Sequence, residues 1–392
     1  VPGRLPALDP SKNLYYNNRA FSKQVNTIFR RSCPLKQILC LSSDPWSTKL
    51  PGRTQQIISR LRDTQILYFS PAQTPTDKSF LQKGRKVRPN VMAYTLPPIR
   101  FPISEWNRLL FQRAWNKVSG FIRDAAARRH FSDPLLWTTH PRHIHLLDRL
   151  EYSALVYDCD RNWEDLPSNW EGSLARAADV VFAASPLLSD RLSPCSANIA
   201  LLPNGINLPI FSPDVPHTDP LPGVTAPILG WCGAIRRSLD LSPVLYAAQA
   251  QPDWGFLLLG GVDRDNPFLG RLERLSNVFL PGALPPSEVP NWLYRCQVLF
   301  DLQSDCPQDD VVSPRLYEYL ATGKPVVSML RPGQIEQFPD VVYGAYSLEE
   351  FVTLCSHAME EAPGFVLQRR RDRAAEASWP RRVEEVERIL TT

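Results

Sequence analysis

Two acids and an arginine lie close together near residue 310, in a stretch that predicts a helix between two strands. Asp310 and Glu318 are separated by seven residues, and Arg315 lies between them. Ser313 is a typical N-cap, and the proline after it needs no N–H, so a helix should begin at residue 314. The free N–H groups of a helix start, together with an arginine fork, favour binding of a diphosphate. The segment therefore predicts an anion site flanked by two carboxylates.

Apolar runs on both sides of this helix indicate the strands that position it. Residues 297–302 (QVLFDL) and 325–330 (PVVSML) read as buried strands, and apolar residues recur at helical spacing between them. Gly323 occupies the expected C-cap position, before Lys324 and Pro325. A simpler interpretation is an ordinary helix between parallel strands, with Glu318 in solvent.

Residues 313–327, SPRLYEYLATGKPVV, resemble the signature of retaining, nucleotide-sugar-dependent glycosyltransferases of the GT-B fold, in the large family 4 group. That group carries two glutamates with seven residues between them, before a G-x-P-V-V strand. Asp310 stands in place of the first glutamate, and Glu318 is the second. The resemblance implies that the first acid contacts donor-sugar hydroxyls and the second contacts the ribose; the neighbouring Asp309 is an alternative for the first role. The residues of this helix expected to bind the donor are Ser313, Arg315, Leu316 and Glu318.

Composition limits the class of protein. The chain has 392 residues and a net charge of +4, so length suggests two or three domains and charge gives no support for nucleic-acid binding. Its eight cysteines form no CxxC pair and match no metal spacing, which favours reduced thiols in the cytoplasm. The sequence from Val1 shows no signal-peptide pattern, and no apolar run is long enough to span a bilayer.

The first half of the chain opens with a strand, a glycine-containing loop and a helix, as doubly wound folds do. The strand is predicted at residues 37–43, and the loop at 49–53 contains Gly52 and Arg53. The resemblance places this loop at the cleft, where Gly52 would allow a phosphate or an acceptor to approach the backbone. An ordinary turn glycine is an equal alternative. No GxGxxG motif supports dinucleotide binding.

A histidine and an aspartate follow the next two predicted strands. His140 comes directly after the buried strand 135–139, at the end where open α/β sheets bind ligands. The resemblance implies contact with the donor sugar or its phosphate. His143 and His145 are expected to be surface or packing residues, because the spacing of the three matches no usual zinc pattern.

The segment VYDCDRNW that contains Asp160 resembles one found in bacterial polysaccharide and teichuronic-acid glycosyltransferases. A carboxylate beyond a strand end can accept a proton from an acceptor hydroxyl, so Asp160 is the candidate base. Asp158 is the alternative, or it simply braces the loop.

Residues 105–130 predict a long helix with apolar positions on one side and six basic residues on the other. Such a helix either lies on an anionic membrane surface or packs on the sheet as a surface helix. Membrane association suits the resemblance, since many enzymes of that type use lipid-linked acceptors.

The second half begins after a proline-rich linker. A glycine-bearing strand and loop at 228–235 precede Arg236 and Arg237, and the resemblance implies that Gly233 and one of these arginines face the diphosphate. An ordinary surface arginine pair is the alternative. The charged helical tail resembles the terminal helix that returns to the N-terminal domain in the same enzymes.

Together these features predict an α/β protein of GT-B type, with two Rossmann-like domains facing a cleft. The expected boundaries are an extension at 1–34, an acceptor domain at 35–209, a linker at 210–227, a nucleotide-sugar domain at 228–368 and a crossing helix at 369–392. The expected reaction is retaining transfer of a sugar from a UDP- or GDP-linked donor to a glycan or lipid-linked acceptor. We expect no metal or other cofactor, no nucleic-acid partner, and a cytoplasmic location with peripheral membrane contact through 105–130. Alternatives are a catalytically altered member that binds nucleotide sugars as a partner or scaffold, and a nucleotide-sugar epimerase of the same fold.

Overall fold

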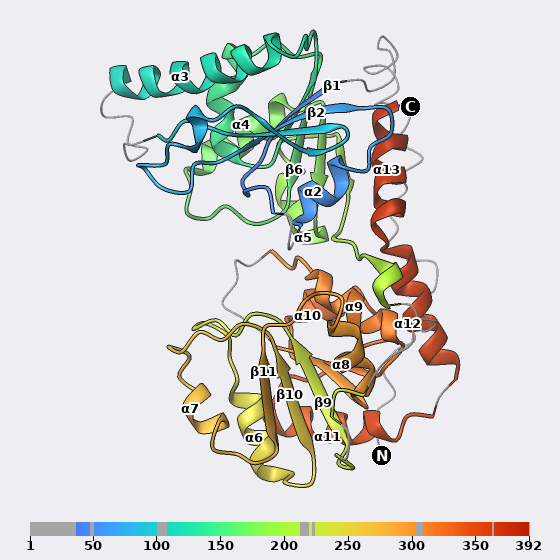
Figure 1. Ribbon diagram of the computed structural model, residues 1–392. Coiled ribbons are helices and arrows are strands. Elements are labelled where there is room, and N and C mark those ends of the chain that lie inside the picture. The colour runs from blue at the N-terminus through green and yellow to red at the C-terminus, as the bar shows by residue number, and fades with distance from the viewer. Residues whose placement is uncertain are drawn as a thin grey trace.

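Two α/β lobes make up the computed structural model of this protein (Figure 1). It describes residues 37–47, 51–99, 108–211, 219–221, 224–302, 309–362 and 364–391. The N lobe comprises the described residues between 37 and 205, and the C lobe those between 206 and 376. The expected extension at 1–34 and most of the expected linker lie outside the described residues.

The N lobe is built on an eight-stranded sheet in which every pairing is parallel except that of β3 with β4. The strand order is β3-β4-β2-β1-β5-β6-β7-β8. Its strands are β1 (Gln37–Leu41), β2 (Gln65–Ser70), β3 (Arg85–Arg88), β4 (Val91–Thr95), β5 (Leu135–Thr138), β6 (Ala154–Cys159), β7 (Val180–Ala183) and β8 (Ile199–Leu201). The central strands are apolar along their whole length, because helices cover the sheet on both faces.

The helices of the N lobe divide between those two faces. One face packs against α3 (Arg108–Ala127), η3 (Pro141–Arg149), α4 (Ser168–Ala177) and α5 (Pro186–Leu192). The other packs against α2 (Arg53–Ile58) and the C-terminal helix α13 (Trp379–Thr391). The short 3₁₀ segment η1 (Ser79–Leu81) also belongs to this lobe, whereas η4 (Leu208–Phe211) packs in the core of the C lobe.

The C lobe contains a six-stranded parallel sheet in the order β11-β10-β9-β12-β13-β14. Counted within the lobe this is 3-2-1-4-5-6, the doubly wound order. The strands are β9 (Ile228–Cys232), β10 (Gly255–Leu259), β11 (Val278–Gly282), β12 (Val298–Asp301), β13 (Val326–Ser328) and β14 (Tyr343–Gly344). The helices are α6 (Ser242–Ala250), α7 (Leu269–Leu272), α8 (Val289–Arg295), α9 (Pro314–Thr322), α10 (Pro332–Ile335), α11 (Leu348–Met359) and α12 (Phe365–Glu376).

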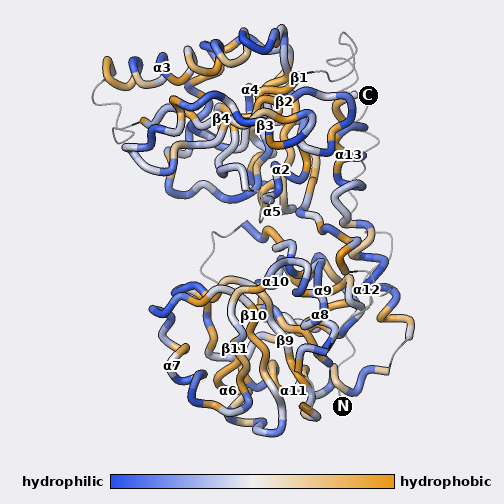
Figure 2. The backbone as a smooth tube through the Cα atoms, viewed as in Figure 1, coloured by the Kyte–Doolittle hydropathy of each residue, from blue (hydrophilic) through white to orange (hydrophobic). Residues whose placement is uncertain are grey.

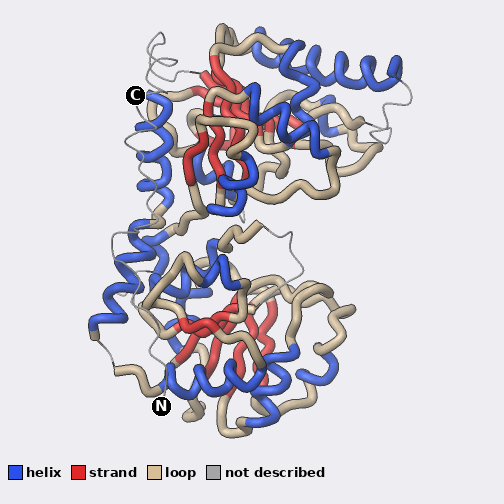
Figure 3. Tube along the Cα trace, turned by 180° about the vertical axis from the view of Figure 1, so that it is seen from behind, coloured by secondary structure: helices blue, strands red, loops and turns tan. Residues whose placement is uncertain are grey.

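The crossing helix begins later than the sequence predicts. Helix α12 still belongs to the C lobe, where it packs on α9 and Arg370 forms a buried ion pair with Glu361. Only α13 returns to the N lobe, and its Val386 and Ile389 join that lobe's core beside α2. Figure 3 shows α13 from behind, running along the edge of the N lobe.

The chain passes between the lobes at two adjacent points, which are bonded to each other. Ile206 donates its N–H to the carbonyl of Ala377, and Trp379 donates to the carbonyl of Ile206. Gly205, in the predicted turn, has no room for a side chain here, because a Cβ atom would lie 2.8 Å from the carbonyl oxygen of Ala377.

Helix α3 packs on the sheet, as one of the two interpretations of its sequence expected. Trp115, Val118 and Ile122 are buried in the N-lobe core, while Leu109 is 73% exposed. Figure 2 shows the apolar and polar residues alternating along the helix. None of the helices in the described part of the chain has the length and apolar character needed to cross a bilayer.

Candidate functional site

The helix α9 starts at the point where the strand order of the C lobe reverses. β9 ends at Cys232 and the neighbouring β12 ends at Asp301, so their carboxyl ends define the switch point at which such sheets bind ligands. Ser313 caps the helix by accepting the N–H of Arg315, and Gly323 closes it with a left-handed φ of 78°. The predicted limits of this helix are therefore confirmed.

Arg315 lies at this switch point, bound to a buried acid that the sequence interpretation missed. Its Nη2 donates to Oδ1 of Asp301 at 2.5 Å, and its guanidinium lies 5.0 Å from the ring centre of Trp231. Asp301 is fully buried, and burial raises the pKa of its carboxyl while Arg315 opposes that change. Nε of Arg315 has no hydrogen-bond partner within the described residues. The guanidinium is thus held in place with donors to spare.

Gly233 lies beside this guanidinium, and its missing side chain leaves room for the arginine itself. A Cβ atom at Gly233 would be 2.5 Å from Nη1 of Arg315 and 2.9 Å from Trp231. Arg236 and Arg237 follow on the same loop, both exposed, and neither forms an ion pair with a described acid. Side chains of the protein itself, Arg315 and Trp231, therefore occupy the space beside Gly233. The two exposed arginines that follow remain accessible to a ligand.

Glu318 lies one helical turn after Arg315, on the same side of α9. It is half-buried and makes no hydrogen bond to a described residue. Burial raises the pKa of its carboxyl to about 7, although the nearby Arg315 lowers it. An unpaired, partly desolvated carboxyl beside a pinned arginine suits a role in binding hydroxyl groups.

Leu316, in contrast, does not line the site with its side chain, and its role in donor binding stays a prediction. The residue is 0% exposed in the C-lobe core. A step of 100° per residue around the helix turns residue 316 away from the face that carries Arg315 and Glu318.

The two neighbouring acids before α9 have different surroundings. Asp309 is buried, accepts the N–H groups of Val311 and of Asn162 from the N lobe, and bonds Ser185 through its carbonyl. Asp310 has a φ of 49°, and its carboxylate lies against Gly333 of α10, where a Cβ atom would be 2.2 Å away. Asp309 is thus occupied in joining the lobes, which favours Asp310 as the candidate for the first acid, a role that stays a prediction.

His140 lies at the corresponding switch point of the N lobe, between the ends of β1 and β5. Its Nδ1 accepts the backbone N–H of Arg142, so the ring proton is on Nε2, and the ring packs 4.3 Å from Trp163. Burial lowers its pKa to about 3, helped by Arg142 and Arg161. His140 is therefore a neutral hydrogen-bond donor at neutral pH. His143, as expected, is a packing residue, buried and bonded to Thr138.

Asp160 is paired rather than free. Arg161 binds both of its oxygens, at 3.0 and 2.9 Å, and also contacts Asp44 at 3.2 Å. Asn162, two residues after Asp160, donates its N–H to Asp309 at 3.2 Å, so this cluster lies near the C-lobe acids across the lobe boundary. Burial raises the pKa of Asp309, and the charge of Asp160 adds to that change.

Asp158 is also paired, with Arg53 from the first loop. Arg53 donates Nε and Nη2 to Oδ1 of this fully buried acid at 3.1 and 2.9 Å. Nη1 of Arg53 is buried without a partner among the described residues. Gly52, before it, is the exposed N-cap position of α2, and a Cβ atom there would meet nothing within 4 Å.

Several residues of this region escaped the sequence interpretation, chiefly Asp301, Trp231, Arg161 and Trp163. A signal existed for Asp301, because a lone acid that ends an apolar strand must find a partner when it is buried. Trp231 and Trp163 carried no comparable signal, since aromatic residues in apolar runs are usually core residues.

Comparison with known proteins gives a consistent result for the fold. No family model matches the sequence. The chain is 24% identical over 303 residues, 71% of its length and 76% of the relative, to a Bacillus subtilis (strain 168) protein that carries the name teichuronic acid biosynthesis glycosyltransferase TuaH. This agrees with the resemblance expected from the VYDCDRNW segment.

Solved structures similar to the chain include sucrose-phosphate synthase from Thermosynechococcus elongatus, with a TM-score of 0.67 at 15% identity over 90% of this chain and 97% of that one. Anabaena Alr3699/HepE, solved with UDP and glucose, has a TM-score of 0.64 at 16% identity over 91% and 99%. The predicted GT-B fold is confirmed by these similarities.

Loss of the acid beneath Arg315 should destabilise the C lobe. Asp301→Asn leaves a buried guanidinium uncompensated, so we expect urea unfolding to show a loss of about 3 kcal/mol. Asp340→Asn is the matched control, because it breaks the exposed pair with Arg369, where Asp340 is 71% exposed, and exposed pairs contribute less than about 1 kcal/mol. Equal losses in both variants would contradict a structural role for the Asp301 pair.

Glu318 should make stability depend on pH. Because burial raises its pKa to about 7 from the ordinary 4.5, the folded protein holds a proton that the unfolded chain releases. The contribution is full below about pH 4.5 and is lost as pH rises through 7. We expect Glu318→Gln to gain about 1 to 3 kcal/mol relative to wild type between pH 4.5 and 8, measured by urea unfolding. A difference that stays constant over this range would rule out the raised pKa.

Proposed function

We propose that this protein is a glycosyltransferase that moves a sugar from a UDP-linked donor onto a hydroxyl acceptor, with retention of anomeric configuration. The observation that carries the proposal is the position of Arg315, pinned at the C-lobe switch point beside the capped start of α9. The relative in Bacillus subtilis is named as a glycosyltransferase, and one structure of the same fold holds UDP and glucose. These similarities support a UDP-linked rather than a GDP-linked donor.

The C lobe would hold the nucleotide and stabilise the departing diphosphate. Arg315 has donors left after its bond to Asp301, and the first N–H groups of α9 add partial positive charge. Arg236 and Arg237 are exposed on the loop beyond Gly233 and would close over the phosphates. Glu318 would accept the ribose hydroxyls, and Asp310 those of the sugar. With these cations in place, the proposal requires no metal ion.

The N lobe would present the acceptor. His140 offers its Nε2 proton to an oxygen of the sugar or the phosphate, since its Nδ1 is already occupied. Asp160, held by Arg161, orients the acceptor hydroxyl rather than removing its proton. In the transfer, the bond from the anomeric carbon to the diphosphate oxygen breaks, the bond to the acceptor oxygen forms, and the acceptor proton passes to the leaving diphosphate.

The proposal is tested by UDP binding and turnover. We expect UDP and UDP-glucose to raise the melting temperature, and Glu318→Gln to weaken UDP about 10-fold in calorimetry, or about 1.4 kcal/mol. Because hydroxyl donors favour the ionised carboxylate, the affinity of the wild type for UDP-glucose, whose diphosphate does not titrate in this range, should rise from pH 6 to 8, whereas the variant should show no such rise. Glu349→Gln, on α11, is the control.

Turnover distinguishes the alternatives. We expect UDP release that depends on an acceptor and persists in EDTA, with the product's anomeric configuration read by NMR. UDP-sugar binding without turnover over a broad acceptor panel would favour a non-catalytic binding partner, and interconversion of UDP-sugars without an acceptor would favour an epimerase. Absence of any response to UDP would contradict the proposal.

We also propose that the protein works at an anionic membrane surface, through the basic side of α3. Residues 77–130 hold 12 lysines and arginines against 3 acids, whereas the whole chain has a net charge of only +4. On α3 the exposed basic residues are Arg113, Lys117, Arg123 and the following Arg128 and Arg129. Since the apolar side of α3 is buried, the contact would be electrostatic.

Vesicle binding tests this proposal. Each basic residue near an anionic surface contributes about 1 kcal/mol, so the triple change Arg113→Gln, Lys117→Gln, Arg123→Gln should reduce partition into phosphatidylglycerol vesicles about 100-fold. The matched triple change Arg264→Gln, Arg271→Gln, Arg274→Gln on the exposed surface around α7 should have little effect. Binding that both triple variants retain would exclude α3 as the contact.

A further inference from the structure

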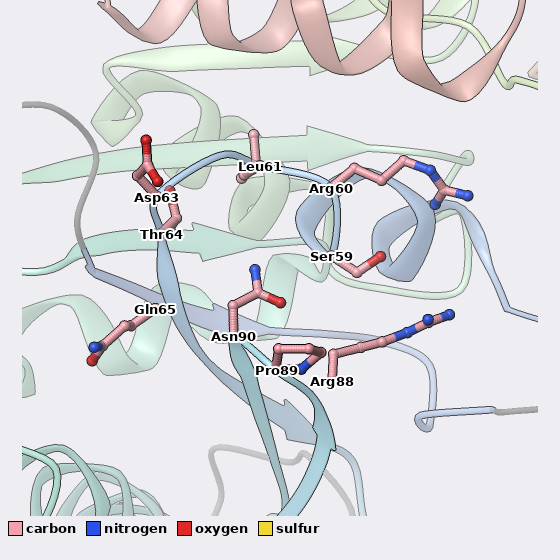
Figure 4. A pocket seen from close by; sticks show the side chains of 9 residues that line it. All are labelled: Ser59, Arg60, Leu61, Asp63, Thr64, Gln65, Arg88, Pro89 and Asn90. Carbon is pink, nitrogen blue, oxygen red and sulfur yellow. The ribbon is translucent and has the colours of Figure 1, made fainter.

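A polar pocket lies on the N lobe, at the end of the sheet opposite to the candidate site described above. It occupies about 810 Å³ where α2 ends and where β2 and β4 begin. The candidate site lies at the carboxyl ends of the strands, whereas this pocket lies at the amino ends of two of them. Figure 4 shows the side chains that line it.

Two guanidinium groups in this pocket have no acid to neutralise them among the described residues. Arg60 is half-buried and uses Nη1 to bind the carbonyl and side-chain oxygens of Gln56, at 2.8 and 2.6 Å. Arg88, on the edge strand β3, is exposed and makes no ion pair. By contrast, the N-lobe arginines Arg53, Arg161 and Arg191 all contact carboxylates.

The two arginines lie near each other. Burial lowers the pKa of Arg60, and the charge of Arg88 lowers it further, so the two cations repel. In Figure 4 both side chains reach toward the same side of the pocket, with the Ser59 hydroxyl between their ends, while Asp63 lies at the opposite end. An anion bound between these two like charges would offset their repulsion.

We propose that this pocket binds a phosphate group, with Arg60 and Arg88 as its charged ligands. Planar guanidinium groups match the oxygens of phosphate, and the Ser59 hydroxyl and Asn90 amide supply neutral donors. The carbonyl of Gln56 at the end of α2 would repel an anion, but Arg60 already satisfies it. The phosphate belongs either to a free ion or to a lipid headgroup. This assignment does not rest on the proposed transferase activity.

Helix α2 links this pocket to the candidate site at the carboxyl ends of the strands. This helix has six residues; Arg53 at its first position binds Asp158 near the candidate site, and Arg60 lies just beyond its last turn. Helix α13 also packs on it. A phosphate that draws Arg60 and Arg88 together would therefore fix the end of the same short helix that carries Arg53.

Calorimetric titration of the whole chain with inorganic phosphate, in chloride buffer, tests the assignment. We expect wild-type binding that weakens about 10-fold or more in Arg60→Gln and in Arg88→Gln. Arg85→Gln is the matched control, because Arg85 is an exposed arginine of the same strand that does not line the pocket. Arg88→Gln keeps the test valid if Arg60→Gln disturbs the end of α2.

A second arm separates the two sources of phosphate. If a lipid headgroup is the ligand, inorganic phosphate will give no heat, and Arg88→Gln will bind phosphatidylglycerol vesicles more weakly than Arg85→Gln does, with phosphatidylcholine vesicles as the blank. If Arg60→Gln and Arg88→Gln behave like Arg85→Gln in both arms, the pocket is not a phosphate site.

Discussion

The ion pair between Asp301 and Arg315 fixes the charge on which the proposed chemistry depends. Asp301 ends β12 in the fully buried interior, and Arg315 meets it from the first turn of α9. Either charge alone would be strongly unfavourable there, so each requires the other. The ring of Trp231, from the neighbouring strand, packs against the guanidinium and adds a cation–π contact. Because the pair joins a strand end to a helix start, the guanidinium is oriented before any ligand arrives.

The N lobe repeats this arrangement with residues from a different part of its fold. Asp158 is fully buried in β6 and holds Arg53 at the start of α2. Burial raises the pKa of its carboxyl while Arg53 opposes that change, as burial and Arg315 do for Asp301. Each lobe therefore fixes a helix start to a strand end through one buried arginine. The two helix starts keep their geometry within their own lobes and do not depend on the few bonds that join the lobes.

Features of the fold that depend on residues adjacent in the chain could be predicted from the sequence, whereas the ion pairs between side chains could not. Ser313, Pro314 and Gly323 fix the limits of α9 through local backbone chemistry, and the apolar runs gave the strands of both lobes. Arg53 and Asp158 are 105 positions apart, and no local rule states that they will meet. Asp160 was expected to be a free base because nothing in the order of residues shows that Arg161 folds back on it. Leu316 was expected among the donor-binding residues from its place in the signature, and the signature alone does not show that its side chain turns into the core.

The segment before α9 connects the acid proposed to bind the donor sugar to the contact between the lobes. Asp309 bonds the N-lobe residues Asn162 and Ser185, while the next residue, Asp310, has the left-handed backbone that directs its carboxylate toward Gly333. An aspartate is one methylene shorter than the glutamate expected at this position, so its reach depends on where the backbone is held. That backbone is held partly by the other lobe. Separation of the lobes would release Asp309 and, with it, the anchor of Asp310, so grip on the donor sugar would be complete only while the lobes remain in contact.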